Sequence, residues 1–177
     1  MIRRLRARLE AEQGFTLVEL TAALAVLSIA LLALMASYDQ AFFSLHSSAK
    51  TTSATLVANN QLELYSALPY ASIGLDASTL ASVKASDTVY AADEAALAGA
   101  AGTDVTISGC GTAPQCLPVQ TVTGSDRRSY RLETFVRDVT SSSITERVVT
   151  VIVRAASVSG SPQVVTLTTA FDKGPRS

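Results

Sequence analysis

The sequence predicts an α+β fold, in which one long N-terminal helix packs on a C-terminal antiparallel β-meander. Two observations support this prediction. An apolar run from Phe15 to Met35 is followed by residues 37–68, which contain neither Gly nor Pro. The last third of the chain consists of short alternating polar and apolar segments separated by turn residues. The 177 residues leave room for one modest soluble domain beside the helix.

Residues 15–35 are long enough to cross a membrane. These 21 residues span roughly 30 Å as a helix, which is the thickness of a hydrocarbon core. Their other polar residues, Thr16, Thr21 and Ser28, can bond back to carbonyls of the preceding turn. The one formal charge is Glu19. A buried acid in lipid costs on the order of 2.5 to 3.5 kcal/mol, less near an interface, so Glu19 is expected to have a partner or a function.

Residues 1–14 form a basic leader that ends on a glycine. The leader carries Arg3, Arg4, Arg6 and Arg8 against Glu10 and Glu12. This bias predicts a cytoplasmic N-terminus and an extracytoplasmic chain after Met35. Removing the leader changes the balance of 14 basic and 15 acidic side chains to 10 and 13, a net charge of −3. Such a balance argues against general electrostatic binding to nucleic acid.

The junction between leader and helix resembles the class III signal of type IV pilins and pseudopilins. The residues that carry the resemblance are Gly14-Phe15-Thr16-Leu17-Val18-Glu19, after a short basic leader and before a long apolar helix. The resemblance implies that prepilin peptidase cleaves after Gly14 and methylates Phe15, and that Glu19 serves assembly. It also implies a pilin-like α+β fold. The implied partners are prepilin peptidase, other pilin or pseudopilin subunits, an inner-membrane assembly platform and, before assembly, membrane lipid.

Two interpretations of Glu19 remain open. In a filament of parallel helices, its carboxylate could pair with the amine of a neighbouring Phe15 and fix the axial register. Alternatively, Glu19 could lie in the headgroup region of an ordinary signal anchor, where its charge would cost little.

Residues 36–68 are predicted to continue the helix as an amphipathic half. Pro69 ends the pattern, and before it small or apolar residues recur near helical spacing at Phe42, Leu45, Ala49, Leu56, Asn60, Leu64 and Leu68. We expect one helix from about Thr16 to Ala67, with its second half on a sheet. The stretch Asn59-Asn60-Gln61-Leu62-Glu63, with Leu68-Pro69-Tyr70, further resembles minor pilins of the PilV or GspI type.

Residues 69–116 are expected to be a connecting region with a cysteine loop. Residues 71–109 are rich in Ala, Ser and Gly, which predicts one short helix around Asp93 to Leu97. Cys110 and Cys116, the only cysteines, are expected to form a disulfide outside the membrane, worth about 2 kcal/mol. Free thiols are the alternative. A metal site would need more ligands than these thiols and His46, the only histidine, which is expected at the surface.

Residues 117–177 are predicted to form an antiparallel sheet. The predicted strands are Leu117–Thr123, Ser129–Val139, Glu146–Ala155 and Gln163–Phe171. In the second strand, the alternation places Tyr130, Leu132, Thr134 and Val136 on one face and Arg131, Glu133, Phe135 and Arg137 on the other. Short loops between the strands favour a meander with one face under the helix.

Five arginines are the one cluster that could bind DNA or another anion. They are Arg127, Arg128, Arg131, Arg137 and Arg154. The favoured interpretation is a solvated face on which they pair with Glu133, Asp138 and Glu146. No RNA-binding motif or helix-turn-helix accompanies them.

No enzymatic motif is present, so the chain is predicted to be a non-enzyme without cofactor or metal. Two function classes remain. The first is a structural subunit, expected to be minor, of a type IV pilus or a type II secretion-like pseudopilus. The second is a signal-anchored extracytoplasmic binding module that never polymerises. In both, the protein spans the cytoplasmic membrane once; in the first it then enters a surface filament. Nucleic acid would be a partner only in a DNA-uptake pilus.

Overall fold

The computed structural model describes residues 16–97, 102–141, 144–156 and 162–173. The chain divides into two units, Met1–His46 and Ser47–Ser177. The first unit contains the beginning of one helix, and the second contains the rest of that helix with a sheet and two further helices.

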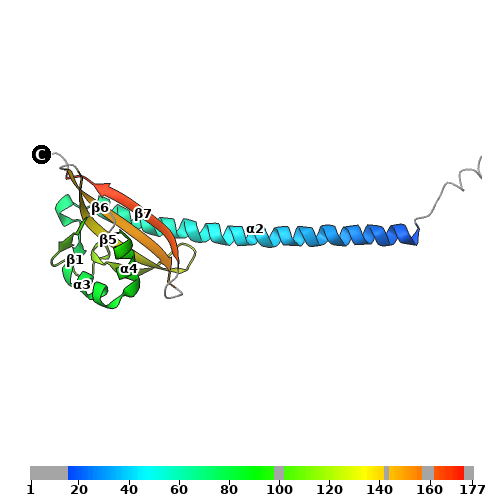
Figure 1. The fold of residues 1–177 in the computed structure, drawn as a ribbon, viewed down its shortest axis with the longest axis horizontal. Helices are drawn as coiled ribbons and strands as arrows, with labels where there is room; N and C mark the ends of the chain where they lie inside the picture. Colours follow the sequence, from blue (N-terminus) through cyan, green and yellow to red (C-terminus); the bar gives the residue numbers. More distant parts are fainter. Residues whose placement is uncertain (1–15, 98–101, 142–143, 157–161, 174–177) are drawn as a thin grey trace, which may run out of the picture. The chain divides into compact units, whose positions relative to one another are not determined.

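Helix α2 runs from Leu17 to Ser66, which confirms the helix predicted from about Thr16 to Ala67 (Figure 1). Its length follows from the absence of Gly and Pro over this stretch. In the first unit, every described residue from 16 to 46 is exposed, including large apolar side chains such as Leu17 (79%) and Ile29 (67%). This part of α2 therefore has no protein partner among the described residues of its own unit.

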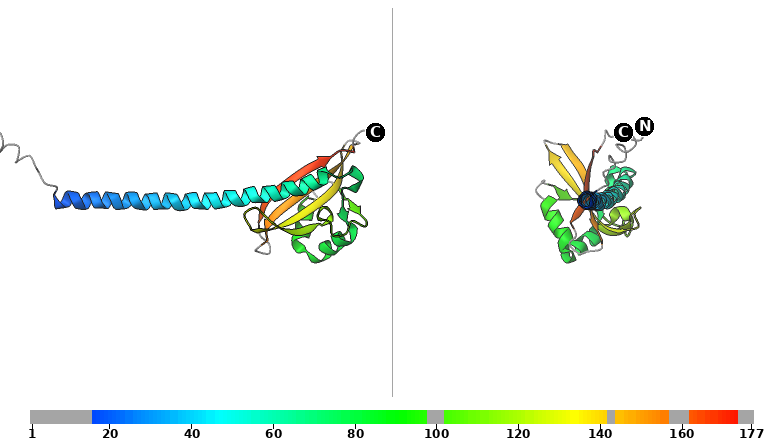
Figure 2. Two further views of the ribbon diagram at one scale, coloured as in Figure 1. Left: turned by 180° about the vertical axis from the view of Figure 1, so that it is seen from behind. Right: turned by 90° about the vertical axis from the view of Figure 1, so that its right-hand side faces the viewer.

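In the second unit, α2 packs one face on the sheet, as predicted, but this is not the face that the helical spacing indicated. The buried residues recur three or four positions apart and are Ser53, Ala54, Val57, Ala58, Gln61, Leu62 and Tyr65. Leu56 and Leu64, on which the prediction relied, lie outside this face and are 49% and 42% exposed; small and polar side chains such as Ala54, Ala58 and Gln61 face the sheet instead. The buried face packs against the sheet; for example, the hydroxyl of Tyr130 donates to the carbonyl of Lys50 at 3.3 Å. Figure 2 shows this cyan part of α2 crossing the strands.

The sheet has β5 at its centre. One edge of β5 (Ser129–Ser141) pairs with β6 (Ile144–Ala155), which pairs with β7 (Gln163–Phe171). The other edge pairs with β2 (Thr103–Asp104) and β4 (Val119–Thr123). All of these pairings are antiparallel. The four strands predicted from residue alternation are therefore confirmed as β4, β5, β6 and β7, and the last three form the expected meander.

Both faces of the sheet are covered, rather than one. The face that includes Tyr130 and Leu132 lies against α2, and the face that includes Phe135 lies against the helices of the connecting region. There, the ring of Tyr90 stacks on Phe135 with centroids 4.5 Å apart, and the Tyr90 hydroxyl donates to the carbonyl of Thr134. As a result, β5 is buried continuously from Leu132 to Val136; Tyr130 is buried too, and Arg131 between them is half-buried.

The connecting region contains more structure than the single short helix that was predicted. Helix α3 (Ala77–Ser86) and helix α4 (Thr88–Leu97) lie beside each other, and β1 (Leu75–Asp76) pairs in parallel with β3 (Thr106–Ile107). Two short 3-10 helices, Tyr70–Ser72 and Pro114–Cys116, complete it. The prediction at Asp93 to Leu97 identified only the end of α4.

Aspartates at both N-termini explain these helices. Asp76 accepts from the Thr79 amide at 2.9 Å and caps α3, while Asp87 accepts from the Val89 and Tyr90 amides at 3.1 Å and starts α4.

Candidate functional site

The N-terminus of α2 is held by a side-chain cap. The Glu19 amide donates to the Thr16 hydroxyl at 3.3 Å, which places Thr16 before the first turn and Glu19 within it. The spacing Thr16-x-x-Glu19 is that of a capping box, which was not predicted from the sequence, but between these described residues only the bond to the Thr16 hydroxyl is formed and not the reciprocal bond to the Glu19 carboxylate. Gly14 and Phe15, the predicted cleavage and methylation residues, lie outside the described residues.

Glu19 stands among exposed apolar side chains. Its neighbours Leu17, Val18 and Leu20 are 79%, 74% and 55% exposed. No side chain of the described residues forms an ion pair with its carboxylate. The negative charge is favourable beside the helix N-terminus, but within the described chain it has no counter-ion.

The other polar side chains of the apolar run are satisfied inside the helix. Thr21 donates to the Val18 carbonyl at 2.9 Å, and Ser28 donates to the Leu24 carbonyl at 2.7 Å, as predicted. The hydroxyl of Thr16 accepts from the Glu19 amide, and the carbonyls of the turn before Thr16 lie outside the described residues. Among the described helices, α2 alone is long and apolar enough to cross a membrane.

Cys110 and Cys116 form a disulfide, with Cα atoms 6.0 Å apart. The loop that the disulfide closes is fixed to α2: Gln61 donates to the Pro114 carbonyl at 3.0 Å, and the hydroxyl of Tyr65 donates to the Gln115 carbonyl. Burial raises the pKa of Tyr65, so its hydroxyl stays protonated and remains a donor. The pairing of the cysteines could be predicted from the sequence but this attachment could not, because Gln61 and Tyr65 are distant from the loop in sequence.

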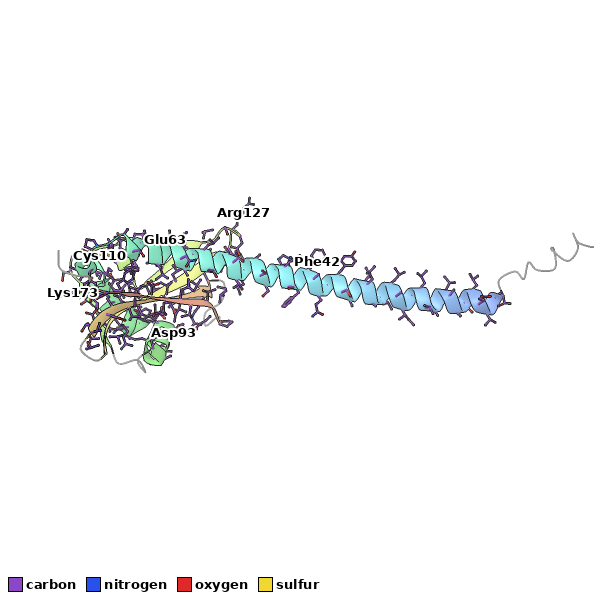
Figure 3. The ribbon with its side chains drawn as sticks, turned by 90° about the horizontal axis from the view of Figure 1, so that it is seen from above. Phe42, Glu63, Asp93, Cys110, Arg127 and Lys173 are labelled. Atoms are coloured by element: carbon purple, nitrogen blue, oxygen red, sulfur yellow. A yellow bond between two sulfur atoms is a disulfide. The ribbon has the colours of Figure 1, made fainter. Side chains whose placement is uncertain are left out.

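A network of charged side chains joins α4 to the sheet. Its contacts are Asp87 Oδ2 to Arg131 Nη2 (2.6 Å), Arg131 Nε to Glu133 Oε1 (2.6 Å), Glu133 Oε2 to Arg154 Nε (3.5 Å), Arg154 Nη2 to Asp93 Oδ2 (2.5 Å) and Asp93 Oδ1 to Gln163 Nε2 (3.3 Å). Figure 3 labels Asp93 on α4. Glu133 is 0% exposed and Arg154 is 9% exposed. The prediction that this face is solvated was therefore wrong: α4 covers it, and pairing allows the charges to be buried.

Two of the three carboxyl groups in the network, those of Glu133 and Asp93, act on each other and have opposite pKa shifts. Burial raises the pKa of Glu133 to about 7, and its hydrogen bond with Asp93 acts in the same direction. Burial also acts to raise the pKa of Asp93, but hydrogen bonds with Glu133 and Arg154 outweigh it, so that pKa is lowered. The shared proton therefore resides on Glu133. Because the Glu133 side chain has no exposed surface, it cannot reach a substrate, and its contribution is structural.

The remaining arginines divide into structural and exposed ones. Arg137 donates to the carbonyls of Leu97 (3.0 Å) and Gly102 (2.6 Å). Asp138, expected to pair with one of the five clustered arginines, pairs instead with Arg147 at 2.8 Å. Of the five arginines in the predicted cluster, only Arg127 and Arg128 are exposed. The other three are therefore not fully open to DNA or another anion, which weakens the alternative of an anion-binding site.

No group of His, Cys, Asp and Glu in the described part of the chain could hold a metal ion. His46 is exposed on α2, as predicted.

One comparison with known proteins gives a match. The family model for the prokaryotic N-terminal methylation motif matches residues 11–35, which include the end of the leader and the first part of α2. Among curated proteins and solved structures, none gives a significant match to this chain.

Proposed function

We propose that this chain, a type IV pilin-like protein by its N-terminal methylation motif, is a minor structural subunit of a type IV pilus or of a type II secretion-like pseudopilus. One observation carries the proposal. The motif stands at the head of a helix that is exposed over residues 17–46, and Glu19 of that helix has no counter-ion within the described chain. A helix of this kind is suited to packing against other copies of itself or of related subunits.

Processing is the first step of the proposal. Prepilin peptidase removes residues 1–14 by cleavage after Gly14 and methylates the amine of Phe15. Cleavage creates a positive charge on the amine of Phe15, four residues before Glu19, where the intact chain has only a peptide bond.

Assembly is the second step. The amine of Phe15 in one subunit meets the Glu19 carboxylate of its neighbour, so both buried charges are satisfied and the axial register is set. The geometry of Thr16 supports this role. Because the Thr16 hydroxyl already accepts from the Glu19 amide, the helix end is capped without the carboxylate, which is left available to another chain.

In the proposed topology, the N-terminus is cytoplasmic and the second unit is extracytoplasmic. The arginines of the leader support this orientation. The Cys110–Cys116 disulfide supports it independently, because such bonds persist outside the reducing cytosol. The assignment as a minor subunit rests on the resemblance of residues 59–63 and 68–70 to minor pilins of the PilV or GspI type.

The second candidate, a signal-anchored binding module that never polymerises, differs from the first at Gly14. Only a filament subunit needs a free amine on Phe15. We expect co-expression with a prepilin peptidase to yield a membrane-extracted protein whose intact mass has lost residues 1–14, gained one methyl group and lost two hydrogens to the disulfide. Gly14→Val should stay at the precursor mass, because its side chain fills the space of a hydrogen. Unchanged processing of Gly14→Val would contradict the cleavage site.

Glu19→Val tests the assembly step separately. The variant should insert into the membrane as well as the parent or better, since a charge in lipid has been removed. It should be depleted from sheared filaments, because the loss of one member of a buried pair typically costs about 3 to 5 kcal/mol. Membrane and filament levels are measured in the same cells. Equal incorporation of variant and parent would leave the plain anchor, or a tip position without a neighbour, as the explanation.

A further inference from the structure

Three aromatic side chains follow the apolar run of α2 within the first unit. Tyr38, Phe42 and Phe43 are 59%, 61% and 79% exposed. Figure 3 labels Phe42 on this stretch of the helix. Exposed aromatic rings are costly in water, at about 25 cal/mol per Å² of apolar surface. Neither the proposed cleavage and methylation nor the proposed pairing of Glu19 involves these three side chains.

Their position matches the dimensions of a bilayer. No charged residue lies between Glu19 and Asp39, and these uncharged residues span roughly 28 Å at 1.5 Å per residue, close to the hydrocarbon thickness. From Tyr38 to Phe43 the helix rises about 7.5 Å, and the interfacial layer on each side of a bilayer is about 5 to 8 Å thick. The amphipathic ring of Tyr38 suits the headgroup level, and the apolar rings of Phe42 and Phe43 suit the boundary between headgroups and acyl chains.

We propose that Tyr38, Phe42 and Phe43 form an aromatic girdle that binds the outer lipid–water interface and fixes the depth of the chain in the membrane before assembly. The proposal rests on the membrane anchoring of the proposed function. It adds the partner surface, the headgroup layer of the outer leaflet, and the residues that recognise it.

The arrangement around the helix favours lipid over a packed protein helix as the occupant. Tyr38 and Phe42 are four residues apart and share one side, but Phe43 is rotated by about 140° from Tyr38. A single neighbouring helix covers a stripe about 100° wide. Lipid surrounds a helix on all sides and can contact all three rings at once.

Single tryptophans provide the test, because the chain contains no Trp. Phe42→Trp and Phe43→Trp keep an aromatic ring at the interface. Leu27→Trp, in the middle of the run, reports the deep core, and Leu56→Trp, 49% exposed in the second unit, reports water. The full-length chain is reconstituted in phosphatidylcholine vesicles. Its fluorescence is quenched with lipids brominated near the headgroup, with lipids brominated deep in the acyl chain, and with aqueous acrylamide.

We expect the bromines near the headgroup to quench the tryptophans at positions 42 and 43 most strongly. The bromines deep in the acyl chain should quench the tryptophan at position 27 most strongly, and acrylamide should quench the one at position 56. The girdle would be overturned if acrylamide quenched positions 42 and 43 as strongly as position 56. It would also be overturned if the deep bromines quenched positions 42 and 43 as strongly as position 27. Position 27 separates this failure from failure of membrane anchoring: if it too loses deep quenching, the chain is not inserted. In a second variant, serine at 38, 42 and 43 should shift the Leu27→Trp probe from deep towards shallow quenching. If the depth of quenching of the Leu27→Trp probe did not change, the three rings would not set the depth of the chain in the membrane.

Discussion

Raising the pH from about 5 to about 8 should destabilise the second unit through Glu133. The pKa of Glu133 is about 7 in the folded chain against an ordinary value near 4.5, so the folded state holds a proton that the unfolded state has released. The resulting stabilisation is fully present below about pH 4.5 and is lost as the pH rises through about 7. The direction is opposite to that of an ordinary ion-paired carboxylate.

The magnitude follows from the two pKa values. They differ by about 2.5, and each pKa unit corresponds to about 1.4 kcal/mol, which gives roughly 3 kcal/mol as an upper bound. The aspartates with shifted pKa values, which include Asp93, are lowered and therefore act below about pH 4. Among the described residues, Glu133 is thus the group expected to produce a slope between about pH 5 and 8.

Glu133→Gln tests whether Glu133 causes this dependence of stability on pH. The amide has the shape of the protonated acid: its oxygen can accept from Arg131 or Arg154 and its nitrogen can donate to Asp93. The variant should therefore match the parent near pH 5, show no slope, and exceed the parent in stability near pH 8. Glu63→Gln, an exposed glutamate on α2, is the matched control and should retain the slope of the parent.

The assay is urea unfolding of the full-length chain in detergent micelles, followed by near-ultraviolet circular dichroism of the buried tyrosines. The free energy of unfolding is measured at several pH values for parent, variant and control. A parent whose stability is flat or rises between about pH 5 and 8 would refute the reasoning. The same slope in Glu133→Gln would show that another group is responsible.

Three further predictions concern the second unit and use the same unfolding assay. Arg154→Met should cost about 3 to 5 kcal/mol, because it leaves the buried Asp93 carboxylate without its cation. Replacing Cys110 and Cys116 by serine should cost about 2 kcal/mol, and in the parent an alkylating reagent should label neither thiol before reduction. Gly124→Ala should cost about 1 to 3 kcal/mol, because its Cβ would lie 2.5 Å from the hydroxyl oxygen of Ser53 on α2.

Arg127→Met, at an exposed position, is the control for Arg154→Met and should change stability by less than about 0.5 kcal/mol. Equal effects of the two arginine substitutions would argue against a buried network. Labelling of Cys110 or Cys116 without reductant would show that the disulfide is open. If Gly124→Ala were as stable as the parent, α2 could move away from the turn between β4 and β5 that contains Gly124.

The long helix and the strands could be predicted because their signals are local. The absence of Gly and Pro allowed α2 to continue to Ser66, and the alternation in β5 assigned its faces correctly. Helices α3 and α4 were underestimated because Ala, Ser and Thr give them little hydrophobic contrast. Their docking depends on a few side chains, such as Leu80 and Tyr90, and on aspartate caps.

Burial of the charged face was missed because Arg131 and Glu133 alternate as they would on a solvated strand. A signal for burial was present in β6, where residues 148–153 form a nearly continuous apolar run, typical of a strand covered on both faces. At the candidate site, the motif identified Gly14, Phe15 and Glu19, whose roles stay predictions. The girdle and the loop attachment depend on exposure and on contacts that no motif encodes.

Asp87 links the unfolding of α4 to the unfolding of β5. One carboxylate oxygen accepts from the amides of Val89 and Tyr90 at the start of α4, and the other accepts from Arg131 on β5. The helix therefore cannot leave the sheet without weakening its own first turn, and a short isolated helix is marginal in water. In hydrogen exchange, the amides of α4 should be protected to the same degree as those of β5 and open together with them, as one cooperative unit.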